Sequence, residues 1–365
     1  MKLLRMLLLL MAVLLTGCTG KRVFKRHMGH EGLEHLGRVI GGSNASPTTY
    51  PFAAFLMIDE GDATAFCGGT IIGRQWILTA GHCVVDTSKG NSIHKSIIRP
   101  NNGTHAKHSM QIRSPRAFKT VAARDIVVGV GDIRNTHVRP LKVSKVYIHP
   151  SLNLDYFDND IALIKLKKKL KFTSNIQPIR IDTGVVSDQM VVTGVGWGKT
   201  SLQSQNTASV LQQVDLQIGD EELCQRIRPE FTGNDGNYIC VTTPEGRDTC
   251  SGDSGGPLLK RCSGDLAQGG SSGTGPWVQL GITSYGDSVA SSQDTVCAAT
   301  DGAGFYTHVA QYLDFISKTT GIKRESLSAT CNGSRLEFVG DANTARMIST
   351  PLLSLALITL LALSI

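Results

Sequence analysis

The stretch that decides the fold is Gly252-Asp253-Ser254-Gly255-Gly256-Pro257. A serine can act as a nucleophile only where a substrate carbonyl can reach it, and the glycines around Ser254 leave that space. The same glycines let consecutive backbone N–H groups point at one spot, as an oxyanion hole requires. Because this hexapeptide alone is also an ordinary turn sequence, its meaning depends on partners elsewhere in the chain.

Two further stretches supply the partners that a nucleophilic serine needs. Leu78-Thr79-Ala80-Gly81-His82-Cys83 places a histidine after a β-like run, and Asp158-Asn159-Asp160-Ile161-Ala162-Leu163 places aspartates at the start of another. An alcohol at its ordinary pKa is a poor nucleophile and needs a base. Histidine titrates near neutral pH, and a buried carboxylate would fix its tautomer. The three stretches together indicate nucleophilic catalysis by serine.

The chain from Val39 onward alternates short apolar runs with turn residues, which is typical of β-strands. Helical periodicity is clear only at Val309 to Ile316, where Gly321 is expected to end the helix. The pattern predicts an all-β chain with a terminal helix, arranged as a sandwich or barrel. The expected strands lie at residues 53–58, 69–72, 126–130, 143–148, 161–166, 190–195 and 277–284.

In the order His, Asp, Ser and in the residues around each, the chain resembles the trypsin-type (chymotrypsin-fold) serine proteases over about residues 39–320. The resemblance implies two antiparallel six-stranded β-barrels, about 39–180 and 181–308, followed by a helix at about 309–320. It implies a serine endopeptidase with its active site between the barrels, and no cofactor.

The roles of the three residues follow from the resemblance. His82 would be the general base and then the general acid, Asp160 would orient its imidazole, and Ser254 would attack the scissile carbonyl. Asp155 and Asp158 would have no such role. The backbone N–H groups of Gly252 and Ser254 would form the oxyanion hole.

The stretch Arg38-Val39-Ile40-Gly41-Gly42 resembles the zymogen junction of this family. Cleavage after Arg38 would free the amino group of Val39, which would become buried and pair with Asp253. Because an unpaired buried carboxylate is costly, the uncut form is expected to be poorly active.

Substrate preference is also implied by the resemblance. Asp248 stands six residues before Ser254, at the position that forms the bottom of the primary pocket in trypsin-like members. Gly286 and Gly304 match the pocket walls, and Ser284 is counted with them as substrate-binding. We expect cleavage after Arg or Lys. Tyr285 departs from the tryptophan usual in the family, and no metal site is expected because no acidic cluster follows Gly131 apart from Asp132.

The nine cysteines fit a secreted, disulfide-bonded protein. The family pattern implies the pairs Cys67–Cys83, Cys224–Cys240 and Cys250–Cys297. Whether Cys262 pairs with Cys331 is left open. The ninth, Cys18, belongs to the N-terminal segment.

The two ends of the chain suggest processing and anchoring. Residues 1–18 have the basic, apolar and small-residue parts of a signal peptide, and 19–38 would be an activation propeptide. As an alternative, Leu15-Thr16-Gly17-Cys18 resembles a bacterial lipobox, which would make the protein a lipoprotein through Cys18. Residues 321–350 are expected to be a linker, and 351–365 a hydrophobic tail that resembles a GPI signal. Glycosylation sequons begin at Asn44, Asn102 and Asn332.

Composition excludes collagen-like, coiled-coil and wholly disordered proteins, since 41% of the 365 residues are hydrophobic and 18% are charged. The net charge of +7 is largely N-terminal: without residues 1–38, 30 basic residues face 28 acidic ones. The remaining excess of basic residues is local. It lies in an expected exposed loop at 86–124, which would suit an acidic partner. A Gly/Ser-rich segment at 263–275 predicts a second surface loop. The lysine run 165–171 fits a solvated turn better than a nucleic-acid site.

The leading hypothesis is a secreted or surface-anchored endopeptidase made as a zymogen, acting on protein or peptide substrates and open to protein inhibitors. The alternative is a catalytically inactive protease homologue that acts as a binding protein.

Overall fold

The computed structural model describes residues 39–61, 63–86, 118–242, 246–262, 273–288, 297–299, 301–332 and 335–337. All of them lie in the structural unit Gly37–Ile365. Several expectations fall outside the described residues: the signal peptide with Cys18, the propeptide with Arg38, most of the loops 86–124 and 263–275, and the hydrophobic tail.

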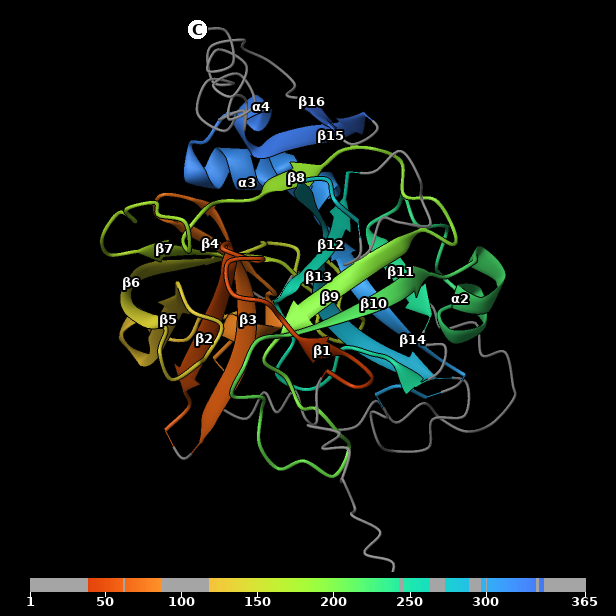
Figure 1. The fold of residues 1–365 in the computed structure, drawn as a ribbon, viewed down its shortest axis with the longest axis horizontal. Coiled ribbons are helices and arrows are strands. Elements are labelled where there is room, and N and C mark those ends of the chain that lie inside the picture. Colours follow the sequence, from red (N-terminus) through yellow and green to blue (C-terminus); the bar gives the residue numbers. More distant parts are fainter. Residues whose placement is uncertain are drawn as a thin grey trace, which may run out of the picture. The chain divides into compact units, whose positions relative to one another are not determined.

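Residues 53–166 form a closed barrel of six antiparallel strands, drawn from orange to yellow in Figure 1. Neighbouring strands follow the order β2-β3-β4-β7-β6-β5. The strands are β2 (Ala53–Asp59), β3 (Thr64–Gly73), β4 (Trp76–Thr79), β5 (Ile126–Val130), β6 (Arg139–Ile148) and β7 (Ala162–Leu166).

A second six-stranded antiparallel barrel follows the order β12-β9-β10-β11-β14-β13, and pairing of β12 with β13 closes it. The expected fold class, two six-stranded barrels with a helix at the C-terminal side, is therefore confirmed. The strands are β9 (Val191–Gly196), β10 (Gln212–Ile218), β11 (Tyr238–Thr242), β12 (Pro257–Arg261), β13 (Trp277–Ser288) and β14 (Gly302–His308).

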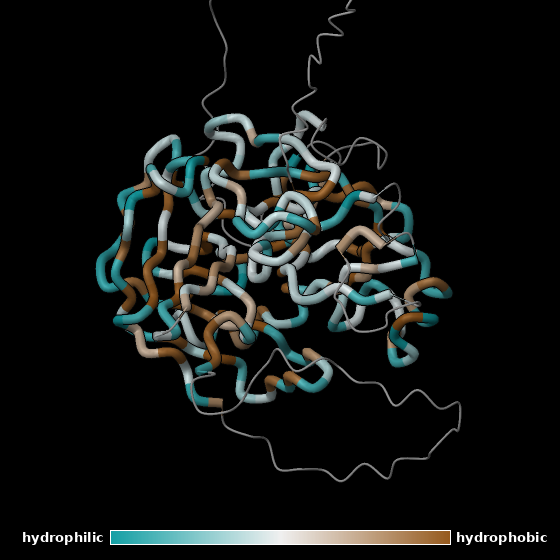
Figure 2. The backbone as a smooth tube through the Cα atoms, turned by 90° about the horizontal axis from the view of Figure 1, so that it is seen from below, coloured by the Kyte–Doolittle hydropathy of each residue, from teal (hydrophilic) through white to brown (hydrophobic). Residues whose placement is uncertain are grey.

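Strand periodicity explains how each barrel fills its core. Along β10, Val214, Leu216 and Ile218 are buried and the residues between them are partly exposed, because successive side chains of a strand point to opposite faces. These three residues join the core cluster of the second barrel, whereas Leu56 and Ile77 belong to that of the first. In Figure 2, hydrophobic (brown) and hydrophilic (teal) stretches alternate along the backbone, and many of the outer loops are teal.

Helices cover the ends of the barrels. Helix α2 (Glu221–Ile227) begins after Asp220, whose Oδ1 accepts a 2.8 Å hydrogen bond from the N–H of Leu223. A 3₁₀ turn (Val309–Tyr312) leads into α3 (Leu313–Thr320), which ends at Gly321 with φ of 72° as expected. Among the described residues, no helix is long and apolar enough to cross a membrane.

The sequence analysis predicted a linker from residue 321, and this prediction is wrong for the described residues up to Glu337. Here the chain forms α4 (Arg324–Leu327), β15 (Ser328–Asn332) and β16 (Arg335–Glu337). Strand β15 pairs in parallel with β8 (Arg180–Asp182), which itself pairs with β13. Leu327 and Ala329 are buried, so this segment has a packed apolar side that its short, irregular sequence pattern does not reveal.

The boundary expected for the first barrel also needs correction at its start. Strand β1 (Ser43–Asn44) pairs with β10, a strand of the second barrel. Val39 is fully buried within the core cluster of that second barrel. Val39 and β1, which were expected in the first barrel, therefore pack against the second barrel. The apolar side chain of Val39 is buried in the core of that barrel.

Four disulfides join distant parts of the described chain. The three pairs that the resemblance implied, Cys67–Cys83, Cys224–Cys240 and Cys250–Cys297, are present. The fourth, Cys262–Cys331, answers the question left open by the sequence and ties β15 to the end of β12.

Candidate active site

His82 begins a short 3₁₀ helix (His82–Val84) shortly after β4. The disulfide between Cys83 and Cys67 ties this turn to β3. The preceding residue, Gly81, packs closely: a Cβ there would lie 3.2 Å from Asp160 Oδ1. Backbone packing thus sets His82 directly against Asp160.

Asp160 is fully buried and accepts three hydrogen bonds on its carboxylate. The backbone N–H of His82 donates to Oδ1 at 2.8 Å, and His82 Nδ1 lies 2.7 Å from Oδ2. The hydroxyl of Ser284 donates to the same Oδ2 at 2.5 Å. A carboxylate with this set of donors orients the imidazole in two ways, through the side chain and through the main chain of His82.

The pKa values of the pair move in opposite directions. Burial raises the pKa of Asp160, but the charge and hydrogen bonds of His82 and the Ser284 hydroxyl outweigh it and hold that pKa below its ordinary value. Burial lowers the pKa of His82, but the charge and hydrogen bond of Asp160 raise it above its ordinary value. An ionised Asp160 favours the tautomer with the proton on Nδ1, which leaves Nε2 as the acceptor.

The loop of Ser254 packs against the strands that lead to His82. The carbonyl of Ser254 accepts a 2.7 Å hydrogen bond from Gly68 N–H, and Cys83 Sγ lies 3.6 Å from the same oxygen. Gly255 has φ of 79°, and a Cβ on it would lie 2.2 Å from Thr79 Oγ1. Only glycine fits here, which explains why this stretch is glycine-rich.

The backbone N–H groups around Ser254 divide into two kinds. Those of Asp253, Gly255 and Gly256 each donate to a backbone carbonyl. Within the described part of the chain, the N–H groups of Gly252 and Ser254 have no acceptor. Both expected oxyanion donors are thus available for a ligand.

Asp253, the expected partner of the freed Val39, is fully buried. Its carboxylate accepts hydrogen bonds from Gly198 N–H at 2.7 Å and Cys250 N–H at 2.9 Å. Burial raises the pKa of Asp253 to about 7, and these two bonds only partly offset it. Among the described residues, no cation forms an ion pair with this acid.

Asp248 is buried and lies close to β14, the strand that pairs with β13. Gly286 and Gly304 are direct cross-strand partners in these strands, and a Cβ on Gly304 would lie 3.6 Å from Asp248 Oδ1. The other oxygen, Oδ2, accepts a 2.9 Å bond from Ala298 N–H. Burial raises the pKa of Asp248 to about 6. Gly304 thus lies beside this buried carboxyl group with Gly286 opposite it in the sheet, whereas Ser284 bonds to Asp160.

Sequence reasoning missed an aromatic wall beside His82. The ring of Phe157 contacts the His82 ring edge-on, with centroids 5.8 Å apart. Phe157 stacks on Tyr285 and Tyr285 stacks on Phe305, each at a centroid distance of 5.0 Å. The wall runs across both barrels, so no local sequence signal could have predicted it.

Arg228 at the end of α2 holds this wall together. Its side chain, only 11% exposed, donates to Asp158 Oδ1 at 2.9 Å and to the carbonyl of Tyr156 at 3.0 Å. It also donates to the hydroxyl of Tyr285. Asp158 therefore has a structural partner, although no catalytic role was expected for it. The segment 156–159 needs support, since Phe157 and Asn159 both have positive φ.

One group of metal-type ligands occurs in the described residues, namely Cys67, His82 and Cys83. Both cysteine sulfurs are bonded to each other, so neither is a thiolate that could bind a metal ion.

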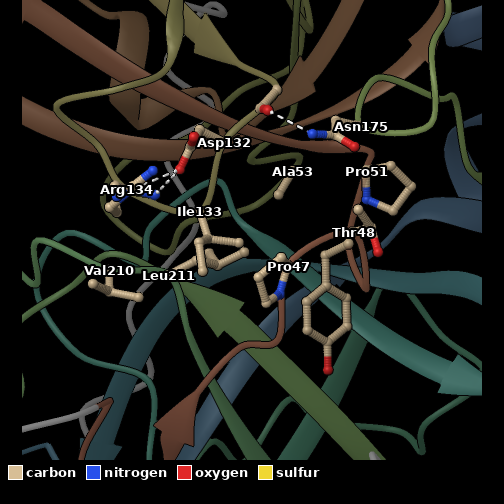
Figure 3. Close-up of a pocket in the computed structure, with 12 residues that line it drawn as sticks. Pro47, Thr48, Pro51, Ala53, Asp132, Ile133, Arg134, Asn175, Val210 and Leu211 are labelled. Carbon is tan, nitrogen blue, oxygen red and sulfur yellow. Dashed lines mark hydrogen bonds and ion pairs between the residues drawn. The ribbon is translucent and has the colours of Figure 1, made fainter.

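A separate pocket of about 370 Å³ lies away from these residues (Figure 3). Arg134 Nε pairs with Asp132 Oδ1 at 3.3 Å on one side of it, and Asn175 Nδ2 donates to Gly131 O at 3.5 Å on another. None of the site residues expected from the sequence lines it.

Comparisons with known proteins agree with the fold. The family model described as trypsin matches residues 39–128 and 116–316. CLIP domain-containing serine protease B4 of Anopheles gambiae is 28% identical over 78% of this chain and 71% of its own length. Mannan-binding lectin serine protease 1 of Homo sapiens is 28% identical over 79% of this chain, which spans only 36% of that relative. Trypsin-1 of Astacus astacus is 30% identical over 76% of this chain and 98% of its own length. The chain belongs to the trypsin family of serine proteases.

Proposed function

We propose that this protein is a serine endopeptidase in which Ser254, His82 and Asp160 act as a catalytic triad. The observation that carries the proposal is the buried Asp160 carboxylate, which receives both the Nδ1 proton and the backbone N–H of His82. A carboxylate in this position fixes the reactive tautomer and stabilises the imidazolium that forms during the reaction.

The reaction has two halves. Ser254 Oγ attacks the carbonyl carbon of the scissile peptide bond while its proton passes to His82 Nε2. The tetrahedral intermediate collapses as His82 returns the proton to the leaving amine, which leaves an acyl-enzyme. Water then attacks the ester carbonyl, again with His82 as base, and the carboxylic acid product leaves as Ser254 regains its proton.

The oxyanion of each tetrahedral intermediate is bound by the N–H groups of Gly252 and Ser254. Their lack of acceptors among the described residues supports this assignment. Loss of one such donor typically lowers kcat by about 10²- to 10³-fold.

The preferred substrate carries Arg or Lys at the cleaved bond. Asp248 supplies a buried carboxyl group, and the lack of side chains on the neighbouring Gly304 and on its strand partner Gly286 supports room for a long cationic side chain. A cationic side chain beside Asp248 would lower its pKa from about 6 and make it fully ionised at neutral pH. Ser284 supports the site through its hydrogen bond to Asp160.

The protein is made as a zymogen that is cut after Arg38. The new ammonium group of Val39 pairs with Asp253, whose raised pKa reflects burial without a cation. Because Arg38 itself fits the expected specificity, self-activation is a testable hypothesis. Equal processing of the zymogen in the Ser254→Ala variant and in the active protein would contradict it.

The proposed location is extracellular. Four disulfides suit an oxidising compartment, as does the signal peptide expected at residues 1–18. Anchoring by GPI near the C-terminus, or alternatively by lipid at Cys18, remains a proposal from the sequence alone. So do protein inhibitors as partners and an acidic partner for the loop 86–124.

Covalent labelling separates this function from that of an inactive homologue. After cleavage at Arg38, a fluorophosphonate probe should label the protein on Ser254, and labelling should be lost in His82→Ala. The control Asp155→Asn changes an exposed acid that contacts no triad residue and should label normally. Absence of labelling in the correctly cut protein would favour the binding-protein alternative.

A further inference from the structure

A row of cations covers the outer face of the first barrel where β6 pairs with β7. We call it the lysine face. The stretches 133–154 and 161–181, which contain both strands and their turns, hold no Asp or Glu. The lysine face consists of Arg139, Lys142, Lys145, Lys165, Lys167, Lys168, Lys169 and Lys171.

Strand register brings these side chains together. Lys145 of β6 stands directly opposite Lys165 of β7. The carbonyl of Lys142 accepts a 2.8 Å hydrogen bond from the N–H of Lys167. All members are exposed except the half-buried Lys165. Lysines that are 20 or more residues apart in the sequence are therefore neighbours on one surface.

Aromatic rings beneath the lysines give the face a rigid base. Lys145 Nζ lies 4.7 Å from the centroid of the Tyr147 ring, and Lys165 Nζ lies 5.4 Å from that of Trp76. The two rings are themselves 5.7 Å apart. Cations held over ring faces keep their charge in a fixed place on the sheet.

Within the part of the chain that the structure describes, no acid pairs with the cations of the lysine face. Elsewhere in the described chain, cations pair with acids, as in Lys119–Asp86 and Lys260–Asp182. No member of the lysine face has an acidic partner among the described residues. Like charges directly opposite each other in a sheet destabilise it. A bound polyanion would remove that repulsion.

We propose that the lysine face binds a sulfated polysaccharide. Seven of its eight cations are lysines, compact point charges that suit repeating sulfate groups. Recognition of one anionic group in a fixed geometry favours the guanidinium fork of arginine, so a lysine-rich face fits a polyanion bound through many equivalent charges. The four disulfides indicate an oxidising, extracellular setting, in which sulfated polysaccharides are the common polyanions.

The lysine face lies apart from the residues of the candidate active site. Its strands belong to the first barrel, and none of its members contacts His82, Asp160 or Ser254 through a hydrogen bond or ion pair in the described structure. Polysaccharide binding would therefore locate the protein on a charged matrix while leaving the site open.

Heparin is the probe, tested on the full chain. The triple variant Lys142→Gln, Lys145→Gln, Lys168→Gln should bind heparin about 10- to 100-fold more weakly, with a shallower dependence of affinity on salt. The control Arg226→Gln, Lys318→Gln, Lys323→Gln removes the same charge from α2, α3 and the start of α4, and should bind as the parent does. Hydrolysis of a small ester substrate should be unchanged in both variants, which also verifies folding.

Three outcomes would overturn the proposal. The first is equal heparin affinity in the two triple variants. The second is retention that persists in the lysine-face variant and disappears when Lys89, Lys95 and Lys107 of the loop 86–124 are changed to Gln. The third is stronger binding of poly-glutamate or duplex DNA than of heparin at matched charge and salt, which would assign the face to an acidic protein or a nucleic acid.

Discussion

Asp160 determines how His82 can act, so replacing Asp160 should shift the pH dependence of activity in a definite direction. His82 must be neutral to accept a proton, so activity should rise with pH through its pKa, which Asp160 holds above the ordinary value. In Asp160→Asn, burial remains but the charge is gone, so the acidic limb of the pH profile of kcat/KM should move to lower pH. Turnover at pH 8 should fall by about 10⁴-fold.

The control for this change is Asp155→Asn, which alters an exposed acid in the same loop. Its pH profile should match that of the parent. An acidic limb that stays in place in Asp160→Asn would show that the carboxylate does not control the pKa of His82.

We propose that Asp248 sets the preference for Arg or Lys at the cleaved bond. Replacing it with Ser leaves a bound Arg or Lys side chain buried without its partner, which costs about 2–5 kcal/mol, or roughly 30- to 4000-fold in kcat/KM. The measurement compares matched peptides that differ only in having Arg or Phe at the cleaved bond. Equal losses for both peptides would contradict a role in charge recognition.

Between elements, Arg228 joins α2, β13 and the segment before Asp160. Arg228→Met should release Phe157 from its stack, because it removes the donors to Asp158 and to the Tyr156 carbonyl. We expect kcat/KM for an extended peptide to fall by about tenfold, as 1.4 kcal/mol of lost contact would give, with a small ester little affected.

Arg226→Met is the matched control, since Arg226 lies on the same helix and is exposed. If kcat/KM fell equally for both substrates in Arg228→Met, the residue would support general stability rather than the aromatic wall.

The elements differ in how far the sequence could predict them. Strands such as 126–130 and the helix ending at Gly321 were predictable, because period and cap residues are local signals. Ser254, His82 and Asp160 were also predictable, since each lies in a short motif.

The partners of these residues were not predictable. Ser284 reaches Asp160 across 124 residues of sequence, and Arg228 reaches Asp158 across 70. Both contacts depend on how segments from the two halves of the fold pack together. The pairing of β15 with β8 involves only two residue pairs, too few for a periodic pattern to reveal.

At the scale of the whole molecule, activation should change how stability depends on pH. In the uncut chain, burial raises the pKa of Asp253 to about 7, above the ordinary value of about 3.9 in the unfolded chain. Between those pH values the folded state holds a proton that the unfolded state has lost, so stability should fall as pH rises. Pairing with the Val39 ammonium should make that fall smaller.

Thermal unfolding of Ser254→Ala, before and after cleavage at Arg38, tests this from pH 4.5 to pH 8. Asp248 titrates in the same range in both forms, so the difference between the two curves reports on Asp253. Identical dependence of Tm on pH in the cut and uncut forms would contradict the ion pair.

We propose above all that the protein cleaves peptide bonds after Arg or Lys, with Ser254 as the nucleophile. Mass spectrometry of a mixed peptide library, incubated with protein cut at Arg38, tests it most directly. We expect new peptides whose C-termini are Arg or Lys, and no new peptides with Ser254→Ala. Peptides left intact by correctly cut protein, or the same cleavages made by Ser254→Ala, would contradict it.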